Sequence, residues 1–149
     1  MTAPGPGGVW QKSRSPTRRN GRAVRVLTID DQAVFRRVAN DVIAATLGFD
    51  SIGEAVSGEE GVAAAAELHP DLVLVDVRMP GIGGIEAARR ITTQCPAAVV
   101  VLITIEEPDE CSHAAGGSGA AALVRKQDFG PELLRRLWNE HGEPSPEVA

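Results

Sequence analysis

The chain has 149 residues, 43% of them hydrophobic, which suffices for one domain with an ordinary core and leaves little room for a second. No apolar run reaches the roughly 18 residues of a membrane span, and the first residues lack the apolar segment of a secretory signal, so we expect a cytoplasmic protein without a membrane partner. The net charge of −5 combines +5 over residues 1–23 with −10 elsewhere, and this acidic body argues against direct nucleic-acid binding by the folded domain.

The two ends of the chain differ in composition from its middle. Residues 1–22 are rich in Pro, Gly, Ser and Arg, which predicts a disordered basic tail. Residues 23–141 are predicted to fold, and residues 142–149 to form a flexible tail. Cys95 and Cys111 are too few for a disulfide framework or a Cys-rich metal site.

The first half of the folded region predicts two strands and two helices. Residues 24–29 form a strand that ends at Asp30 and Asp31. A helix is then predicted from about residue 32 to 47, and the members of its buried stripe are Val34, Val38, Val42 and Ala45. Residues 49–55 form the second strand. Ser57 and Glu60 have the spacing of a capping box that opens a second helix, which Pro70 closes.

The third strand, residues 72–75, is a continuous apolar run that ends on Asp76, as in a parallel sheet covered on both faces. A Met-Pro-Gly turn follows, and the next helix runs to Pro96, with Ile85, Ala88 and Ile91 on its buried side. Asp76 therefore lies at the carboxyl end of a central strand, although many Asp residues in such places only cap a loop.

The last third predicts two more strands with helices between and after them. Residues 98–103 form a strand that ends on Thr104, and the glycine-rich segment 108–117 predicts only a short helix. Residues 120–125 form the fifth strand, which ends at Lys126. Pro131 opens the last helix, whose apolar stripe consists of Leu133, Leu134, Leu137 and Trp138.

Strand and helix thus alternate five times. Short right-handed crossovers then predict an α/β fold of the flavodoxin-like, doubly wound (βα)5 type, with a five-stranded parallel sheet in the order 2-1-3-4-5. No glycine-rich phosphate loop follows the first strand, because Asp30 and Asp31 occupy that place.

Polar groups end four of the five strands and should meet at one edge of the sheet. Three carboxylates in one place repel each other, and a bound divalent cation relieves that repulsion. Mg²⁺ suits such a site because it takes carboxylate oxygens and keeps positions for phosphate oxygens. A carboxylate can itself accept a phosphoryl group.

These residues resemble those of response-regulator receiver domains, the phosphoacceptor modules of two-component signalling. The match covers Asp30-Asp31, the segment from Asp76 to Gly81, Thr104 and Lys126, in order and with the family's spacing. The resemblance implies that a sensor histidine kinase phosphorylates Asp76 and that Thr104 and Lys126 contact the phosphoryl group. It also implies that Mg²⁺ is held by Asp30, Asp31, Asp76 and the backbone carbonyl of Arg78.

The resemblance further implies a signalling domain rather than an enzyme with turnover, apart from phosphotransfer to itself and slow autodephosphorylation. Residues 81–90 look most like receivers that precede a helix-turn-helix output domain, which we expect to be separate from this chain. An effector protein is the alternative partner. The family often forms homodimers through its fourth helix, fifth strand and fifth helix, and we also consider Trp138 as part of that face.

Three departures from the family pattern put the switch in doubt. Leu123 stands where the family usually has an aromatic ring, Ile105 stands where a small residue is usual, and residues 82–84 replace the usual loop. The alternative is therefore a pseudo-receiver, a protein-binding module that works without phosphate. A metal-dependent phosphatase is a weaker alternative, because Arg78 stands where such enzymes commonly have a second Asp. His69, His113 and His141 have no metal-ligand spacing and are expected on the surface.

Overall fold

The computed structural model describes residues 21–107 and 112–142. The two predicted tails lie outside these ranges except for residues 21, 22 and 142, and Cys111 lies outside them as well. Among the described residues, no helix has the length and apolar character that crossing a membrane would need.

The strands form one parallel sheet in the predicted order β2-β1-β3-β4-β5. The strand bounds are β1 Val24–Ile29, β2 Phe49–Ala55, β3 Leu72–Asp76, β4 Val99–Thr104 and β5 Ala122–Arg125. All residues of β3 and β4 are buried, as their apolar sequences require. The reversal of strand order therefore falls between β1 and β3, where doubly wound sheets bind their ligands.

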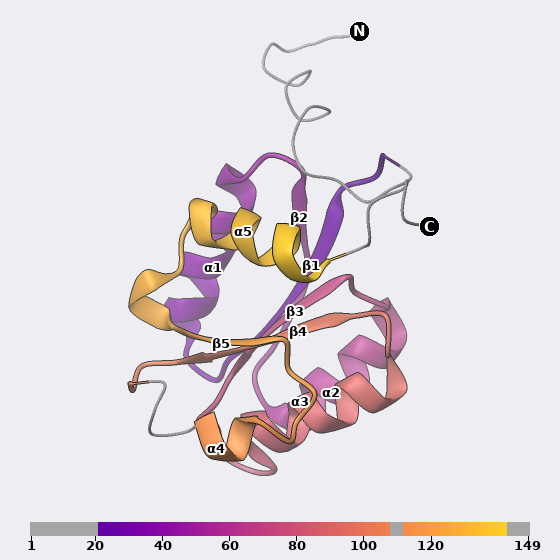
Figure 1. Cartoon of the computed structure of the whole chain (residues 1–149), viewed down its shortest axis with the longest axis vertical. Helices are drawn as coiled ribbons and strands as arrows, with labels where there is room; N and C mark the ends of the chain where they lie inside the picture. The colour runs from indigo at the N-terminus through magenta and orange to yellow at the C-terminus, as the bar shows by residue number, and fades with distance from the viewer. Residues whose placement is uncertain (1–20, 108–111, 143–149) are drawn as a thin grey trace, which may run out of the picture.

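Helices cover both faces of the sheet (Figure 1). The helix bounds are α1 Ala33–Ala45, α2 Gly58–Leu68, α3 Gly83–Gln94, α4 Ser112–Ala115 and α5 Pro131–His141, with a 3-10 turn, η3, at Lys126–Asp128. α1 and α5 pack on one face, and α2 and α3 on the other (Figure 1). The sheet thus separates two apolar clusters, and its carboxyl ends remain uncovered by these long helices.

The predicted buried stripe of α1 is wrong at Val34, Val38 and Ala45, which are exposed, whereas Val42 is half-buried and packs against the core. The buried residues of α1 are Phe35, Ala39 and Ile43, whereas Val34 is 74% exposed and Val38 is 43% exposed. Both sets have helical spacing, so periodicity alone did not distinguish them. Phe35 is selected because its ring packs against Phe129, with 6.0 Å between the ring centroids.

The predicted capping box of α2 is present. The Ser57 hydroxyl accepts the backbone N–H of Glu60 at 3.1 Å, and the Glu60 carboxylate accepts the N–H of Val56 at 2.7 Å. The first bond satisfies a backbone donor that the helix start leaves free, and the second ties the residue before the N-cap to the first turn. They fix the point at which the chain turns from β2 into α2.

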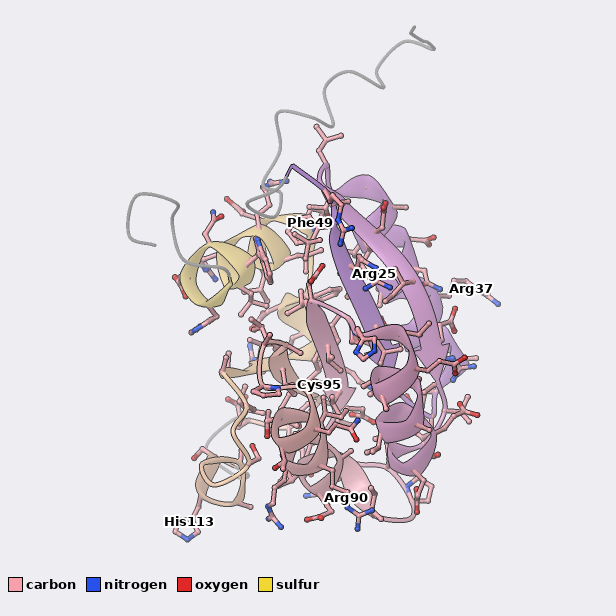
Figure 2. All side chains as sticks on the ribbon, turned by 90° about the vertical axis from the view of Figure 1, so that its right-hand side faces the viewer. Arg25, Arg37, Phe49, Arg90, Cys95 and His113 are labelled. Carbon is pink, nitrogen blue, oxygen red and sulfur yellow. The ribbon has the colours of Figure 1, made fainter. Side chains whose placement is uncertain are left out.

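The remaining helices agree with their predicted character. Within the described residues α4 runs over Ser112–Ala115, and the first four residues of the segment predicted for it, 108–111, lie outside them. Trp138 on α5 is 6% exposed and packs in the core, so it does not contribute to a partner-binding face. His69, His113 and His141 are exposed, and His113 projects from α4 (Figure 2).

Candidate functional site

Three acidic residues meet at the carboxyl edge of the sheet. Asp30 follows β1, Asp76 ends β3, and the two strands are hydrogen-bonded neighbours. One carboxylate oxygen from each of Asp30, Asp31 and Asp76 lies within 4.8 Å of the others. The structure therefore brings together the three acids that the strand ends predicted.

Two of these acids are buried, and local contacts fix their positions. Asp30 is 1% exposed and Asp76 is 7% exposed, whereas Asp31 is open to solvent. Asp30 Oδ1 accepts the backbone N–H of Gln32 at 2.8 Å, which turns the chain into α1. Arg36 Nη1 donates to the Asp30 carbonyl oxygen at 2.8 Å from the first turns of that helix.

Lys126 supplies the positive charge inside the site. Its Nζ lies 2.7 Å from Asp30 Oδ2 and 3.6 Å from Asp76 Oδ1, and its side chain is 11% exposed. The ammonium also lies 4.8 Å from the centroid of the Phe35 ring, a cation–π contact. Lys126 was predicted in the site from its place at the end of β5, whereas nothing in the sequence predicted that Phe35 supports it.

Asp76 is the acid that the site perturbs most clearly. Burial and the neighbouring charge of Asp30 raise the pKa of Asp76 from 3.8 to about 6, and Asp31 adds to this rise. Lys126 and a hydrogen bond from the backbone N–H of Arg78 act in the opposite direction. Near neutral pH the group is still mostly ionised, so it carries a charge that its surroundings disfavour.

The donor set fits a hard divalent cation. Asp30 Oδ2 is buried and accepts no well-aligned hydrogen bond from the described residues, its counter-charge being Lys126. Carboxylate oxygens are the ligands that Mg²⁺ prefers, and a cation would offset the repulsion that raises the pKa of Asp76. The site therefore has both the ligand chemistry and an electrostatic need for such an ion.

Thr104 ends β4, and Arg78 lies in the loop that follows β3. In the register of β3 and β4, Thr104 is one position beyond Ile103, the partner of Asp76. Thr104 is 1% exposed, and its hydroxyl accepts the backbone N–H of Glu106 at 3.0 Å. Arg78 Nη2 pairs with Glu106 Oε2 at 2.7 Å. The sequence offered only two opposite charges near neighbouring strand ends, which does not predict an ion pair.

Gly84 allows α3 to begin directly against β3. A Cβ atom at this position would collide with the carbonyl oxygen of Asp76, while the Gly84 N–H donates to the carbonyl of Val77 at 3.0 Å. The glycine is therefore required by a close approach of two backbones. It fixes the peptide that carries the candidate acceptor.

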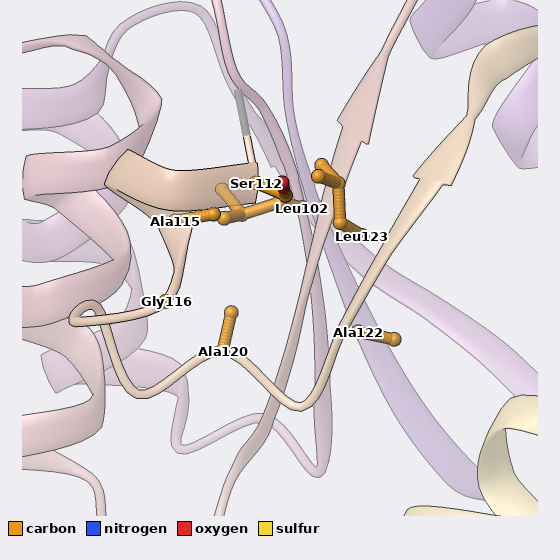
Figure 3. Close-up of a pocket in the computed structure, with 7 residues that line it drawn as sticks. All are labelled: Leu102, Ser112, Ala115, Gly116, Ala120, Ala122 and Leu123. Atoms are coloured by element: carbon orange, nitrogen blue, oxygen red, sulfur yellow. The ribbon is translucent and has the colours of Figure 1, made fainter. Parts of the chain in front are cut away.

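A hollow of about 160 Å³ lies between α4 and β5, beside Leu123 (Figure 3). Its lining residues are Leu102, Ser112, Ala115, Gly116, Ala120, Ala122 and Leu123. Leu123 is half-buried, and Ile105 is 73% exposed at the end of β4. Leu123 thus borders this hollow, and the Ile105 side chain points into solvent.

Known proteins are similar to this chain both in sequence and in fold. The family described as response regulator receiver domain matches residues 26–138. Response regulator GacA of Pseudomonas viridiflava is 41% identical over 114 residues, which are 76% of this chain and 53% of that protein. A protein-glutamate methylesterase/protein-glutamine glutaminase of Myxococcus xanthus is 40% identical over 110 residues, which are 73% of this chain and 31% of that protein.

Solved structures give the same assignment. The response regulator domain of Thermotoga maritima CheB is 30% identical, with a TM-score of 0.72 over 83% of this chain and 100% of that one. A two-component response regulator of the LuxR family from Aurantimonas is 27% identical, with a TM-score of 0.73 over 85% of this chain and 92% of that one. The chain spans about half the length of the GacA proteins it matches. It belongs to the response regulator receiver domain family of two-component signal transduction.

Proposed function

We propose that the chain accepts a phosphoryl group from a sensor histidine kinase on Asp76, in a Mg²⁺-dependent reaction, and signals through protein contacts. One observation carries the proposal: Asp76 ends β3 within 4.8 Å of Asp30 and Asp31, with Lys126 Nζ 3.6 Å from Asp76 Oδ1. A purely structural acid would not need two further carboxylates beside it.

The acceptor chemistry follows from the ionised carboxylate. With a pKa of about 6, Asp76 is mostly deprotonated at pH 7.5 and is available as a nucleophile. Its oxygen attacks the phosphorus of a phosphohistidine; the new P–O bond forms as the P–N bond breaks, and the imidazole leaves with that electron pair. Attack by water on the acyl phosphate then returns the carboxylate and inorganic phosphate.

The surrounding residues would bind the phosphoryl group and the metal ion. Lys126 contributes positive charge beside the incoming phosphoryl oxygens, and Thr104 contributes a hydroxyl that can donate to one of them. Asp30, Asp31, Asp76 and the backbone carbonyl of Arg78 would hold Mg²⁺. When bound, the ion supplies charge that offsets the acids and draws in phosphate oxygens.

The proposal extends to the rest of the chain. We assign the receiver to residues 23–141 of a cytoplasmic protein and leave residues 1–22 and 142–149 outside it. The output passes to an effector protein or to a separate output domain, with a homodimer through α4, β5 and α5 as a further arrangement. We assign no nucleic-acid contact to the acidic folded domain.

Intact mass spectrometry tests the acceptor. We expect incubation with a small phosphodonor and Mg²⁺ to add the mass of one phosphoryl group to the wild-type chain, and to add nothing to Asp76→Asn. Chelation of Mg²⁺ should abolish the gain. A gain that persists in Asp76→Asn would contradict the assignment of the acceptor.

A second candidate function is a pseudo-receiver that binds partners without phosphate. The hollow beside Leu123 and the exposed Ile105 favour it, because the family's usual aromatic switch has no counterpart here. The same experiment separates the two functions. If no phosphodonor or Mg²⁺ concentration changes the mass of the wild-type chain, the pseudo-receiver is the better description.

A further inference from the structure

Two ion pairs hold the segment that follows β4. Glu106 Oε2 pairs with Arg78 Nη2 at 2.7 Å, and Glu107 Oε2 pairs with Arg125 Nη1 at 2.7 Å. The first arginine belongs to the loop after β3 and the second ends β5. Adjacent acids of one loop are therefore tied to the strands on either side of β4.

Only the first of these pairs connects directly to the acceptor. Arg78 is two residues after Asp76, and its backbone N–H donates to the Asp76 carboxylate. Glu106 is two residues after Thr104, and its backbone N–H donates to the Thr104 hydroxyl at 3.0 Å. Side chain and backbone of Glu106 are thus both held by residues of the candidate phosphoryl site.

We propose that Arg78 is an additional phosphoryl-binding residue, which pairs with Glu106 as long as Asp76 is unphosphorylated. Transfer of the Arg78 guanidinium from Glu106 to phosphorylated Asp76 is the switch of this receiver. The inference rests on the proposed function. A phosphoryl group brings close to two negative charges and oxygens whose geometry matches a guanidinium fork. The carboxylate of Glu106 offers one charge, so the exchange favours the phosphorylated acceptor.

The weakness of the present pair makes this exchange feasible. The Arg78 side chain is 68% exposed and that of Glu106 is 25% exposed, so solvent screens their attraction. Exposed pairs of this kind change an equilibrium by about fivefold at most. The ion pair with Glu106 therefore opposes the exchange only weakly, and Arg78 is only two residues after Asp76 in the chain.

The exchange also gives the phosphorylated and unphosphorylated states different contacts, which a switch requires. A charge biases an equilibrium only if the two states contact it differently, and Leu123 provides no ring to do so. When Arg78 leaves Glu106 and the Thr104 side chain rotates so that its oxygen moves from the Glu106 N–H to the phosphoryl group, Glu106 loses both its ion pair and its backbone hydrogen bond. The loop that carries the exposed Ile105 is then free to change position.

Beryllofluoride with Mg²⁺, a mimic of an aspartyl phosphate, provides the test. Its affinity for the full chain is measured by calorimetry in the wild type, Arg78→Ala, Glu106→Gln and the double variant. We expect Glu106→Gln to bind up to about fivefold more tightly and Arg78→Ala to bind several-fold more weakly. The gain from Glu106→Gln should vanish when Arg78 is absent, because Glu106 acts through that residue.

Glu107→Gln is the matched control. It removes the same charge from the neighbouring position and frees Arg125 instead of Arg78, so it reports any general effect of a less acidic loop. We expect its affinity to stay close to that of the wild type. An equal gain in Glu107→Gln, or a gain from Glu106→Gln that survives in the double variant, would overturn the exchange.

Amide hydrogen exchange gives a readout independent of affinity. We expect beryllofluoride to speed exchange at the Glu106 amide in the wild type, because Thr104 no longer accepts its hydrogen bond; unchanged protection there would contradict the switch. If the wild type neither binds beryllofluoride nor gains mass from a phosphodonor, the proposed function fails together with this inference. If it does both and the four affinities are equal, only the inference fails.

Discussion

Replacing Asp76 by Asn should stabilise the metal-free protein at neutral pH. Asparagine has nearly the shape of the protonated acid and carries no charge, so it removes what burial and Asp30 make unfavourable. The usual expectation for a change at a buried polar residue is a loss of stability. A gain here is therefore a discriminating result.

The size of the effect follows from the pKa of Asp76, which rises from 3.8 to about 6 on folding. Because each pKa unit corresponds to about 1.4 kcal/mol, the ionised group lowers the free energy of unfolding by about 3 kcal/mol above pH 6. The sign is fixed by linkage: the folded state binds the proton more tightly than the unfolded state. The destabilisation is therefore full above the folded pKa, fades as the pH falls through it, and is absent below 3.8.

The assay is urea denaturation of wild type and Asp76→Asn from pH 4 to pH 8 in the presence of a chelator. We expect the variant to be more stable by about 3 kcal/mol at pH 7.5, which is on the order of 10 °C in Tm. The difference should shrink towards pH 4, and taking the difference cancels the titrating groups that do not interact with Asp76. A variant that is less stable than the wild type at pH 7.5, or a difference independent of pH, would show that the ionised Asp76 carboxylate does not destabilise the fold.

Three further changes test other parts of the site. Lys126→Met leaves the buried Asp30 carboxylate without its counter-charge and should cost about 3 kcal/mol of stability in chelator, measured by urea denaturation, with partial recovery on adding Mg²⁺. Gly84→Ala places a methyl group against the backbone carbonyl at the end of β3 and should cost about 1–3 kcal/mol, whereas Gly117→Ala, with no atom near its Cβ position, should cost little; equal effects would contradict the packing argument. Leu123→Phe should be tolerated, with a change in Tm of at most a few degrees, because the ring can enter the adjacent hollow; a loss of several kcal/mol would show that the hollow cannot admit it.

The arrangement of the fold and the grouping of the acids could be predicted from the sequence. Both depend on where strands end, and a continuous apolar run that stops at Asp76 marks that point clearly. Once strands and helices alternate, crossover handedness and strand order follow from general rules. The carboxyl ends then meet at one edge, so Asp30, Asp31 and Asp76 come together whatever the details of packing.

The buried face of α1 and the ion pairs could not be predicted in the same way. Both Val34 and Phe35 begin an apolar stripe of helical spacing, and only the tertiary contact with Phe129 selects the second. Arg78 and Glu106 are 28 positions apart, and their pairing depends on how far two side chains reach between neighbouring loops. Periodicity reports a residue's position along its own element and carries no information about such reach.

The end of β3 concentrates most of what the site requires in a few residues of one chain segment. Asp76 provides the carboxylate, the backbone N–H of Arg78 donates to it, and Gly84 lets α3 pack on its carbonyl oxygen. The Arg78 side chain reaches the loop after β4 through Glu106. A charge added at Asp76 therefore acts first on the hydrogen bond and the guanidinium supplied by its own segment. Because that guanidinium already bridges two loops, we expect a local change of charge to alter the contact between those loops without requiring the central sheet to move.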